Sequence, residues 1–179
     1  MKKMLAPLHL KYILVFILSI RCVFGEEKWY DAEDGSRYLV VDEDNYNWFE
    51  ALTACATRGL SLVSIQSEEK QNALVDVLKK TGKMFYWIGA VGTYIPNGGL
   101  VFRWINDGEE FDYTNWRPSE PNGRGNENCV HLDRHNYRWN DNNCRTNKMA
   151  LVCEEISRVT QMKKYISSLE RFLDEVIVF

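Results

Sequence analysis

Two short polar segments in the second half of the chain carry residue types that could bind a metal ion. The first is Glu120-Pro121-Asn122, followed by Glu127, and the second is Asn140-Asp141. Their carboxylate and amide oxygens suit a hard cation such as Ca²⁺, which takes six to eight oxygen ligands. Either segment alone is typical of an ordinary Asn-, Asp- and Gly-rich surface loop. Because the first segment leads into Cys129 and the second into Cys144, a pair of cysteines fifteen residues apart, the pattern favours a calcium site.

Two helices and a β half rich in loops are expected to position these segments. Apolar residues at helical spacing begin after Asn47 and end before Gly59, and a second helix begins near Ser67. Residues 37–41 and 85–90 have the composition of strands, and the sequence from there to residue 153 is dense in Trp, Gly, Asn and Pro. This order predicts an α+β fold, whose long loops would need disulfides or a metal ion to hold them.

Residues 1–25 have the layout of a secretory signal peptide. They contain no acid, Lys2 and Lys3 precede an apolar run over residues 12–20, and Val23 and Gly25 precede a cut before residue 26. The run is too short to span a bilayer, although an uncleaved membrane anchor is the alternative. No second candidate span follows, so we expect a secreted, extracellular protein without a membrane span.

Cleavage would change both the cysteine count and the charge. Cys22 would leave, and an even set that suits disulfides in an oxidising compartment would remain: Cys55, Cys129, Cys144 and Cys153. Three pairings are possible, and none of the spacings matches a Cys-x2-4-Cys zinc site. Removing four of the 22 basic residues leaves 18 against 25 acidic residues, a formal charge of −7. Such a surface repels phosphate backbones, so nucleic acid is not an expected partner.

The end of the chain has a heptad pattern. Apolar residues recur at alternating steps of three and four, which is typical of a helix with one apolar seam: Val159, Met162, Ile166, Leu169, Leu173 and Val176. The seam covers under three heptads, which is short for an independent coiled coil. Two interpretations stay open. The tail docks on its own domain, or it forms a homo-oligomer through residues 159–176.

The motifs together resemble the C-type lectin domain. They occur in the order and at the spacing of that family: Trp87-Ile88-Gly89-Ala90, Glu120-Pro121-Asn122, Glu127-Asn128-Cys129, Trp139-Asn140-Asp141 and Cys144-x8-Cys153. The resemblance covers about residues 28–155. We therefore divide the chain into a signal peptide (1–25), a C-type lectin-like carbohydrate-recognition domain (26–155) and a C-terminal amphipathic helical tail (156–179). For the domain it implies two helices, a loop-rich antiparallel β half and two disulfides, Cys55–Cys153 and Cys129–Cys144.

The resemblance also implies the ligands of one calcium ion and of a bound sugar: Glu120, Asn122, Glu127, Asn140 and Asp141. It implies a cis peptide before Pro121, which would aim the side chains on either side at one point. One oxygen from each side chain and the Asp141 carbonyl make six, so two positions remain for vicinal sugar hydroxyls. The Glu-Pro-Asn order resembles binders of mannose, N-acetylglucosamine and fucose-type diols. Residues 91–99 contain no acid, so we expect no auxiliary calcium.

Two other functions compete with this interpretation. An enzyme is disfavoured, and we expect no catalytic residues. His131 and His135 have the His-x3-His spacing of zinc proteases, but Leu132 stands where those enzymes need Glu. Glu120 and Glu127 could be paired as in glycosidases, yet as metal ligands they would be held ionised. The second alternative is a non-enzymatic protein-binding module on the same fold, with calcium as a structural ion.

Overall fold

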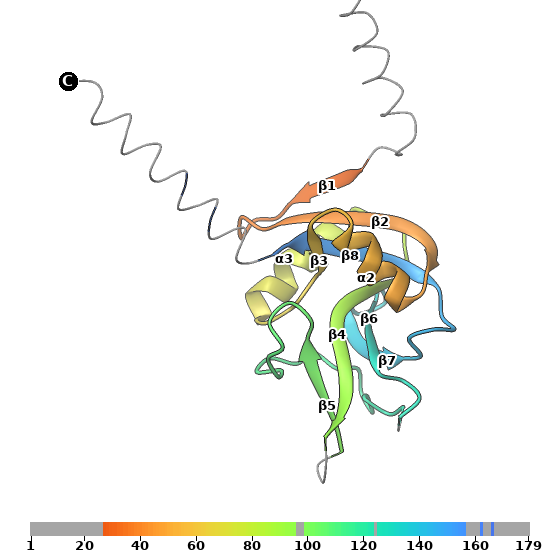
Figure 1. Ribbon diagram of the computed structural model, residues 1–179. Helices are drawn as coiled ribbons and strands as arrows, with labels where there is room; N and C mark the ends of the chain where they lie inside the picture. Colours follow the sequence, from red (N-terminus) through yellow and green to blue (C-terminus); the bar gives the residue numbers. More distant parts are fainter. Residues whose placement is uncertain (1–26, 96–98, 124, 157–161, 163–165, 167–179) are drawn as a thin grey trace, which may run out of the picture.

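The computed structural model describes residues 27–95, 99–123 and 125–156, together with Met162 and Ile166. The expected signal peptide, and the expected tail apart from residues 156, 162 and 166, lie outside the described residues. Figure 1 shows the arrangement of the elements. In chain order they are β1 (Lys28–Asp31), β2 (Arg37–Tyr46), α2 (Trp48–Ala56), β3 (Leu60–Leu62), α3 (Glu68–Leu78), β4 (Phe85–Ile95), β5 (Gly99–Trp104), β6 (Cys129–Asp133), β7 (Arg138–Asn142) and β8 (Met149–Glu155).

Both expected helices form, and each begins at the residue that the sequence indicates. The Asn47 side chain accepts a hydrogen bond from the Glu50 backbone N–H, and the Glu50 carboxylate accepts one from the Asn47 N–H. This reciprocal capping box satisfies two N–H groups that the helix cannot pair itself. Ser67 caps α3 by accepting from the backbone N–H of Lys70. Gly59 follows α2 at φ +70°, a conformation that glycine adopts without strain.

The strands form one mixed sheet in the order β1-β2-β8-β4-β6-β7, with β3 paired to β8 and β5 paired to β4. The β4–β5 pair is a hairpin that extends away from the body of the domain (Figure 1). The expectation of an antiparallel β half is corrected at one place, because β4 and β8 run parallel. The final strand, β8, lies between β2 and β4. It runs antiparallel to β2 and parallel to β4. Local patterns in the sequence do not report such a long-range insertion.

The two helices cover opposite faces of the sheet and create two apolar cores. Successive strand residues point to opposite faces, so Trp87 and Leu151 pack with α2, whereas Ile88 and Val152 pack with α3. The disulfide Cys55–Cys153 ties α2 to β8. The disulfide Cys129–Cys144 ties the start of β6 to the segment that follows β7. Both pairings implied by the resemblance are therefore confirmed.

Candidate functional site

The candidate site lies at the end of β7, which α3 and an aromatic cluster hold in place. The indole N–H of Trp139 donates to Gln71 Oε1 at 2.9 Å, and Gln71 Nε2 donates to the Tyr137 carbonyl at 2.9 Å. The Trp139 ring also lies 5.3 Å from Phe111 and 5.7 Å from Trp116, both with edge-on geometry. These contacts fix the long loop between β5 and β6 against β7.

Near its middle, that loop forms one isolated parallel β-bridge with β7, between Trp116 and Trp139, and then turns. The Trp139 N–H donates to the Asn115 carbonyl at 2.8 Å, and the Arg117 N–H donates to the Trp139 carbonyl at 2.9 Å. After Arg117 the chain turns back, with the Glu120 N–H donating to the Arg117 carbonyl at 3.1 Å. The Glu120–Pro121 peptide is cis in the structure. The turn brings the Glu-Pro-Asn segment beside the end of β7.

Asp141 joins the two polar segments. Its side chain is almost completely buried, with 1 % of the residue exposed. Oδ1 accepts from the Asn122 N–H at 3.1 Å and Oδ2 accepts from the Gly123 N–H at 2.9 Å. Hydrogen bonds to an ionised carboxylate are stronger than those between neutral groups. Asp141 therefore holds the backbone of the Glu-Pro-Asn segment at the end of β7.

Gly123 and Glu127 are in close contact across the rest of the loop. A Cβ added to Gly123 would lie 2.2 Å from the Glu127 Cβ and 2.7 Å from its Oε2, so a side chain at this position has no room. The turn between them is closed by the Asn126 N–H, which donates to the Gly123 carbonyl at 2.9 Å. Asn143, just after β7, donates from Nδ2 to the Asn126 carbonyl at 3.2 Å. These contacts keep Glu127 near the Glu-Pro-Asn segment.

The acidic side chains of the site repel one another. Burial raises the pKa of Glu120, and the hydrogen bond and negative charge of Asp141 raise it further, while Arg117 opposes the shift. Burial and the charge of Asp141 also raise the pKa of Glu127. One carboxylate oxygen of Glu120, Oε2, is buried and has no hydrogen-bond partner among the described residues. Such a group is costly to bury, and a cation would relieve both the repulsion and the missing partner.

The structure brings together some of the expected ligands and separates others. Glu120, Glu127 and Asp141 interact electrostatically, and Asn122 lies beside them through its backbone. Asn140 lies on the opposite face of β7, because neighbouring strand residues alternate, and it borders a separate cavity. In the described part of the chain, no group of three or more His, Cys, Asp or Glu side chains is arranged to hold a metal ion as it stands.

Sequence reasoning missed several residues that shape the site. Arg117 Nη1 lies 3.1 Å from Oδ2 of the buried Asp133, which fixes the guanidinium beside β6. Gly125, at φ +98°, lies against the hydroxyl of Tyr94 from the β4–β5 hairpin. Gly125 carries the signal of a glycine within a turn. For Arg117 and Tyr94 no local signal exists, because their partners are distant in sequence.

The histidine pair does not form the arrangement of a zinc protease. His131 is buried on β6, whereas His135 is exposed in the turn that follows. A zinc protease of that type needs both histidines on one face of a helix. This geometry removes the specific reason to consider a zinc enzyme.

Comparison with known proteins places the chain in a family. Residues 44–155 match the Lectin C-type domain. The chain belongs to the C-type lectin family. It is 33% identical over 148 residues to the lectin subunit alpha of Sarcophaga peregrina, covering 79% of this chain and 52% of that protein. The chain thus spans about half the length of this relative.

Two solved structures of C-type lectins have the same fold. One is the cow CD23 carbohydrate-recognition domain in the presence of a GlcNAc2Man3 oligosaccharide, with 31% identity, 74% of this chain and 96% of that chain covered, and a TM-score of 0.58. The other is the Ca²⁺-independent C-type lectin SPL-2 from Saxidomus purpuratus, with 29% identity, 70% and 89% covered, and a TM-score of 0.58. C-type lectins bind carbohydrates and are not enzymes, so the family, fold and non-enzyme predictions are confirmed.

Across the residues that the structure describes, no helix has the length and apolar character needed to cross a bilayer.

Proposed function

We propose that this C-type lectin is a secreted protein that binds mannose-type sugars through one calcium ion. The ion would be held by the five residues of the two polar segments: Glu120, Asn122, Glu127, Asn140 and Asp141. The observation that supports this most directly is that Glu127 and Asp141 act on Glu120, whose buried Oε2 has no hydrogen-bond partner among the described residues. Glu120 and Glu127 have raised pKa values, and among the described residues Arg117 is the one cation that opposes the shift of Glu120. Such carboxylates match the preference of calcium for anionic oxygen ligands.

Calcium binding would require a local rearrangement. Asp141 now uses both carboxylate oxygens to accept from the Asn122 and Gly123 backbones, and each oxygen retains a further lone pair for an ion. Asn140 would have to turn its amide from the opposite face of β7 toward the edge of the strand. The repulsion that raises the Glu120 and Glu127 pKa values would be exchanged for attraction to the ion. Calcium would supply the charge that binds two sugar hydroxyls, and the side chains would orient them.

The order of donors and acceptors supports mannose-type selectivity. A hydroxyl bound to the ion still has one proton to donate and a lone pair with which to accept. A Glu carboxylate accepts and an Asn amide donates, so the order of Glu120 and Asn122 restricts the orientation of the diol. Mannose, N-acetylglucosamine and fucose-type diols share the matching arrangement. Exchanging the polarity with Glu120→Gln and Asn122→Asp is expected to move retention from mannose toward galactose, and unchanged mannose retention would contradict this explanation.

Affinity chromatography tests the proposal. The protein is applied to mannose-agarose and to galactose-agarose with calcium, and a chelator is then added. Retention on mannose alone, with release by the chelator, supports a calcium-dependent mannose-type lectin. Oligosaccharides are also incubated with the protein, and they are expected to remain intact.

One observation favours a second candidate function, calcium-independent binding of a sugar or a protein. The relative SPL-2 is described as Ca²⁺-independent, and no ready-made metal group occurs among the described residues. Retention that survives the chelator would support calcium-independent binding. Absence of retention on both sugars, with calcium still bound in a calorimetric titration, would support a protein-binding module with a structural ion.

A further inference from the structure

A polar cavity of about 380 Å³ lies on the α2 face of the sheet, over β6 and β7. α2 packs against β2, β3, β4 and β8 on this face, and the cavity lies further along it. His131 and Asn140 are paired across the two strands and form part of its floor. Its size falls within the range of about 300–1,000 Å³ that is common for ligand pockets.

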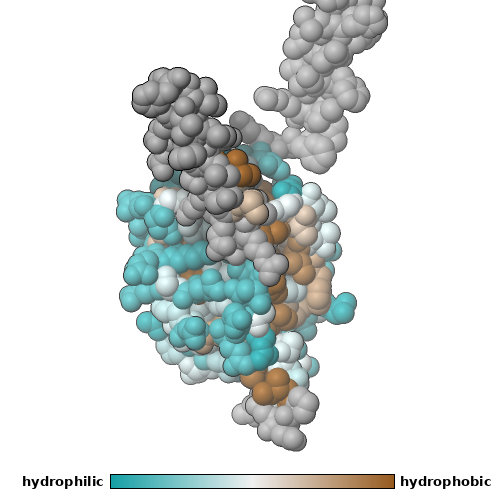
Figure 2. Space-filling model, turned by 60° about the vertical axis from the view of Figure 1, so that its left-hand side comes forward, coloured by the Kyte–Doolittle hydropathy of each residue, from teal (hydrophilic) through white to brown (hydrophobic). Residues whose placement is uncertain are grey.

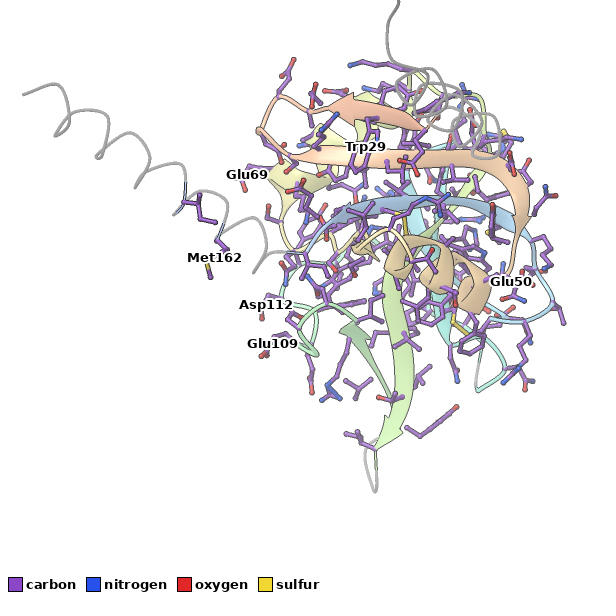
Figure 3. The ribbon with its side chains drawn as sticks, turned by 45° about the horizontal axis from the view of Figure 1, so that its top comes forward. Trp29, Glu50, Glu69, Glu109, Asp112 and Met162 are labelled. Atoms are coloured by element: carbon purple, nitrogen blue, oxygen red, sulfur yellow. A yellow bond between two sulfur atoms is a disulfide. The ribbon has the colours of Figure 1, made fainter. Side chains whose placement is uncertain are left out.

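The side chains around the cavity are mainly hydrogen-bond donors. Two are cationic, Arg117 and Lys148, and the lining contains no Asp or Glu. Each cation already has one carboxylate partner outside the lining: Asp133 for Arg117, and Glu50 for Lys148. Glu50 lies in the first turn of α2, where Figure 3 labels it. A guanidinium has five N–H groups and an ammonium has three, so both cations keep donors for a ligand.

Three amide side chains add to this donor-rich lining. Asn147 donates to the side-chain carbonyl of Asn142, which also accepts from the Asn143 backbone N–H. The side-chain oxygen of Asn142 therefore already accepts two hydrogen bonds. Its side-chain nitrogen donates to no acceptor among residues 125–156. The third amide belongs to Asn140.

His131 provides an independent observation that points to a polar ligand in the cavity. His131 borders the cavity and is only 2 % exposed. Its Nδ1 atom has no hydrogen-bond partner among the described residues. The imidazole packs edge-on against the Phe85 ring, with 5.4 Å between the ring centroids. A buried ring nitrogen without a partner costs free energy, and nearly all such groups in proteins are paired. A polar ligand in the cavity would relieve this cost directly or through a bridging water.

Apolar side chains complete the lining on one side. Phe85, which is 38 % exposed, and Met149 both border the cavity. An exposed aromatic ring beside polar donors suits a sugar, because a sugar ring has an apolar C–H face and a polar edge. Because the lining contains two cations and no Asp or Glu, it favours a sugar whose polar edge carries a negative charge.

We propose that this cavity is a second binding site, which takes an anionic sugar. The sulfate or carboxylate group binds between Arg117 and Lys148, and the sugar ring packs on Phe85. The site goes beyond the proposed calcium site: the two share Asn140, but none of the three acidic calcium ligands is part of this lining. The whole chain has a formal charge of −3, so a single anionic sugar is favoured over a long polyanion.

Calorimetric titration of the full protein in the presence of a chelator tests this site. The probes are N-acetylglucosamine 6-sulfate, glucuronic acid, neutral N-acetylglucosamine and inorganic sulfate. At least one anionic sugar is expected to bind roughly tenfold more tightly than the neutral sugar, because hydrogen bonds to a charged group are the stronger ones. The two anionic sugars distinguish sulfate from carboxylate as the preferred group. Because calcium is absent, failure of the mannose proposal leaves this result unaffected.

Variants then locate the binding. Lys148→Gln is expected to weaken binding of the anionic sugar roughly tenfold. Lys79→Gln is the matched control, because Lys79 is an exposed lysine paired with Asp76 on α3, outside the lining. Arg117→Lys keeps a charge beside the buried Asp133, so the fold is preserved, but it removes the planar fork and weakens binding as well. Phe85→Ala is expected to weaken binding of the sugar but not of inorganic sulfate.

Three results would each overturn the proposal. The first is equal affinity for the anionic and neutral sugars. The second is wild-type affinity in Lys148→Gln, with an unchanged unfolding midpoint. The third is binding that appears only when calcium is added, because it would assign the sugar to the calcium site instead.

Discussion

Gly123 controls how closely the two halves of the candidate calcium site approach. Its missing side chain lets the Glu127 Cβ come within 2.2 Å of the point where a Cβ would lie. A methyl group there cannot be accommodated by rotating the end of a flexible side chain, because the contact is with the Glu127 Cβ itself. The backbone of the loop would have to move, and Glu127 would move with it.

We therefore expect Gly123→Ala to lower calcium affinity by roughly tenfold or more, the effect of losing one charged contact. The matched control is Gly82→Ala, because a Cβ at Gly82 meets no atom within 4 Å. Calcium titration calorimetry measures both variants. Wild-type affinity in Gly123→Ala would show that Glu127 does not need its present place to bind the ion.

His131 makes the stability of the domain depend on pH. Burial lowers its pKa from 6.5 to about 4; the charges of Asp133 and Asp141 oppose the shift and that of Arg117 adds to it. The folded state therefore binds fewer protons than the unfolded state between these two values. Stability conferred by the neutral ring is complete above pH 6.5 and is lost as the pH falls toward 4.

Between pH 7.5 and pH 5 this loss amounts to about 2 kcal/mol of unfolding free energy. Urea unfolding of the wild type and of His131→Gln, with a chelator present, measures it. The difference in unfolding free energy between the two proteins is expected to shift by that amount, to the disadvantage of the wild type at pH 5. A difference that is constant with pH would mean that the ring titrates normally.

At the scale of elements, the two disulfides have different tasks. Cys55–Cys153 joins α2 to the central strand β8 across 98 residues, whereas Cys129–Cys144 spans 15 residues around β6 and β7. A cross-link stabilises mainly by restricting the unfolded chain, and the effect grows with loop length. Loops of these lengths correspond to about 5 and 3 kcal/mol respectively. Both loops contain Asp141, but the shorter one closes directly around β6 and β7, the strand that carries it.

Replacing each pair with alanines is expected to separate stability from calcium binding. Loss of Cys55–Cys153 should lower the unfolding free energy more, and loss of Cys129–Cys144 should lower calcium affinity more. Denaturant unfolding and calcium titration of both double variants provide the comparison. If one variant shows the larger loss in both measurements, the shorter disulfide has no separate role in the site.

The elements also show which parts of the structure could be predicted from the sequence. The starts of α2 and α3 depend on Asn47 and Ser67, which pair with groups three residues away, so local patterns were sufficient. The parallel pairing of β4 with β8, the bonds of Asp141 to the Asn122 and Gly123 backbones, and the Arg117–Asp133 ion pair join distant segments. Such contacts depend on the folded arrangement. The disulfide pairing and the candidate ligands came from resemblance to a family.

At the scale of the whole molecule, the surface is unevenly polar. Figure 2 shows a face on which hydrophilic residues predominate, with hydrophobic residues gathered along one side. Met162 and Ile166, from the expected tail seam, are 59 % and 48 % exposed, and Figure 3 shows Met162 away from the body of the domain. Docking of the tail on its own domain and pairing with another copy of the chain both stay predictions. We propose the second, because these two apolar seam residues are exposed.

Met162→Glu together with Ile166→Glu tests the two interpretations, because charges at seam positions oppose helix pairing. Light scattering is expected to show a multimer for the wild type and a monomer for the variant, with the same unfolding midpoint for the domain. Retention on sparsely coupled mannose-agarose should fall, because linked sites gain avidity without new contacts. Lys79→Gln, at the C-cap of α3, is again the control. A lower unfolding midpoint with an unchanged mass would instead show that the tail packs on its own domain.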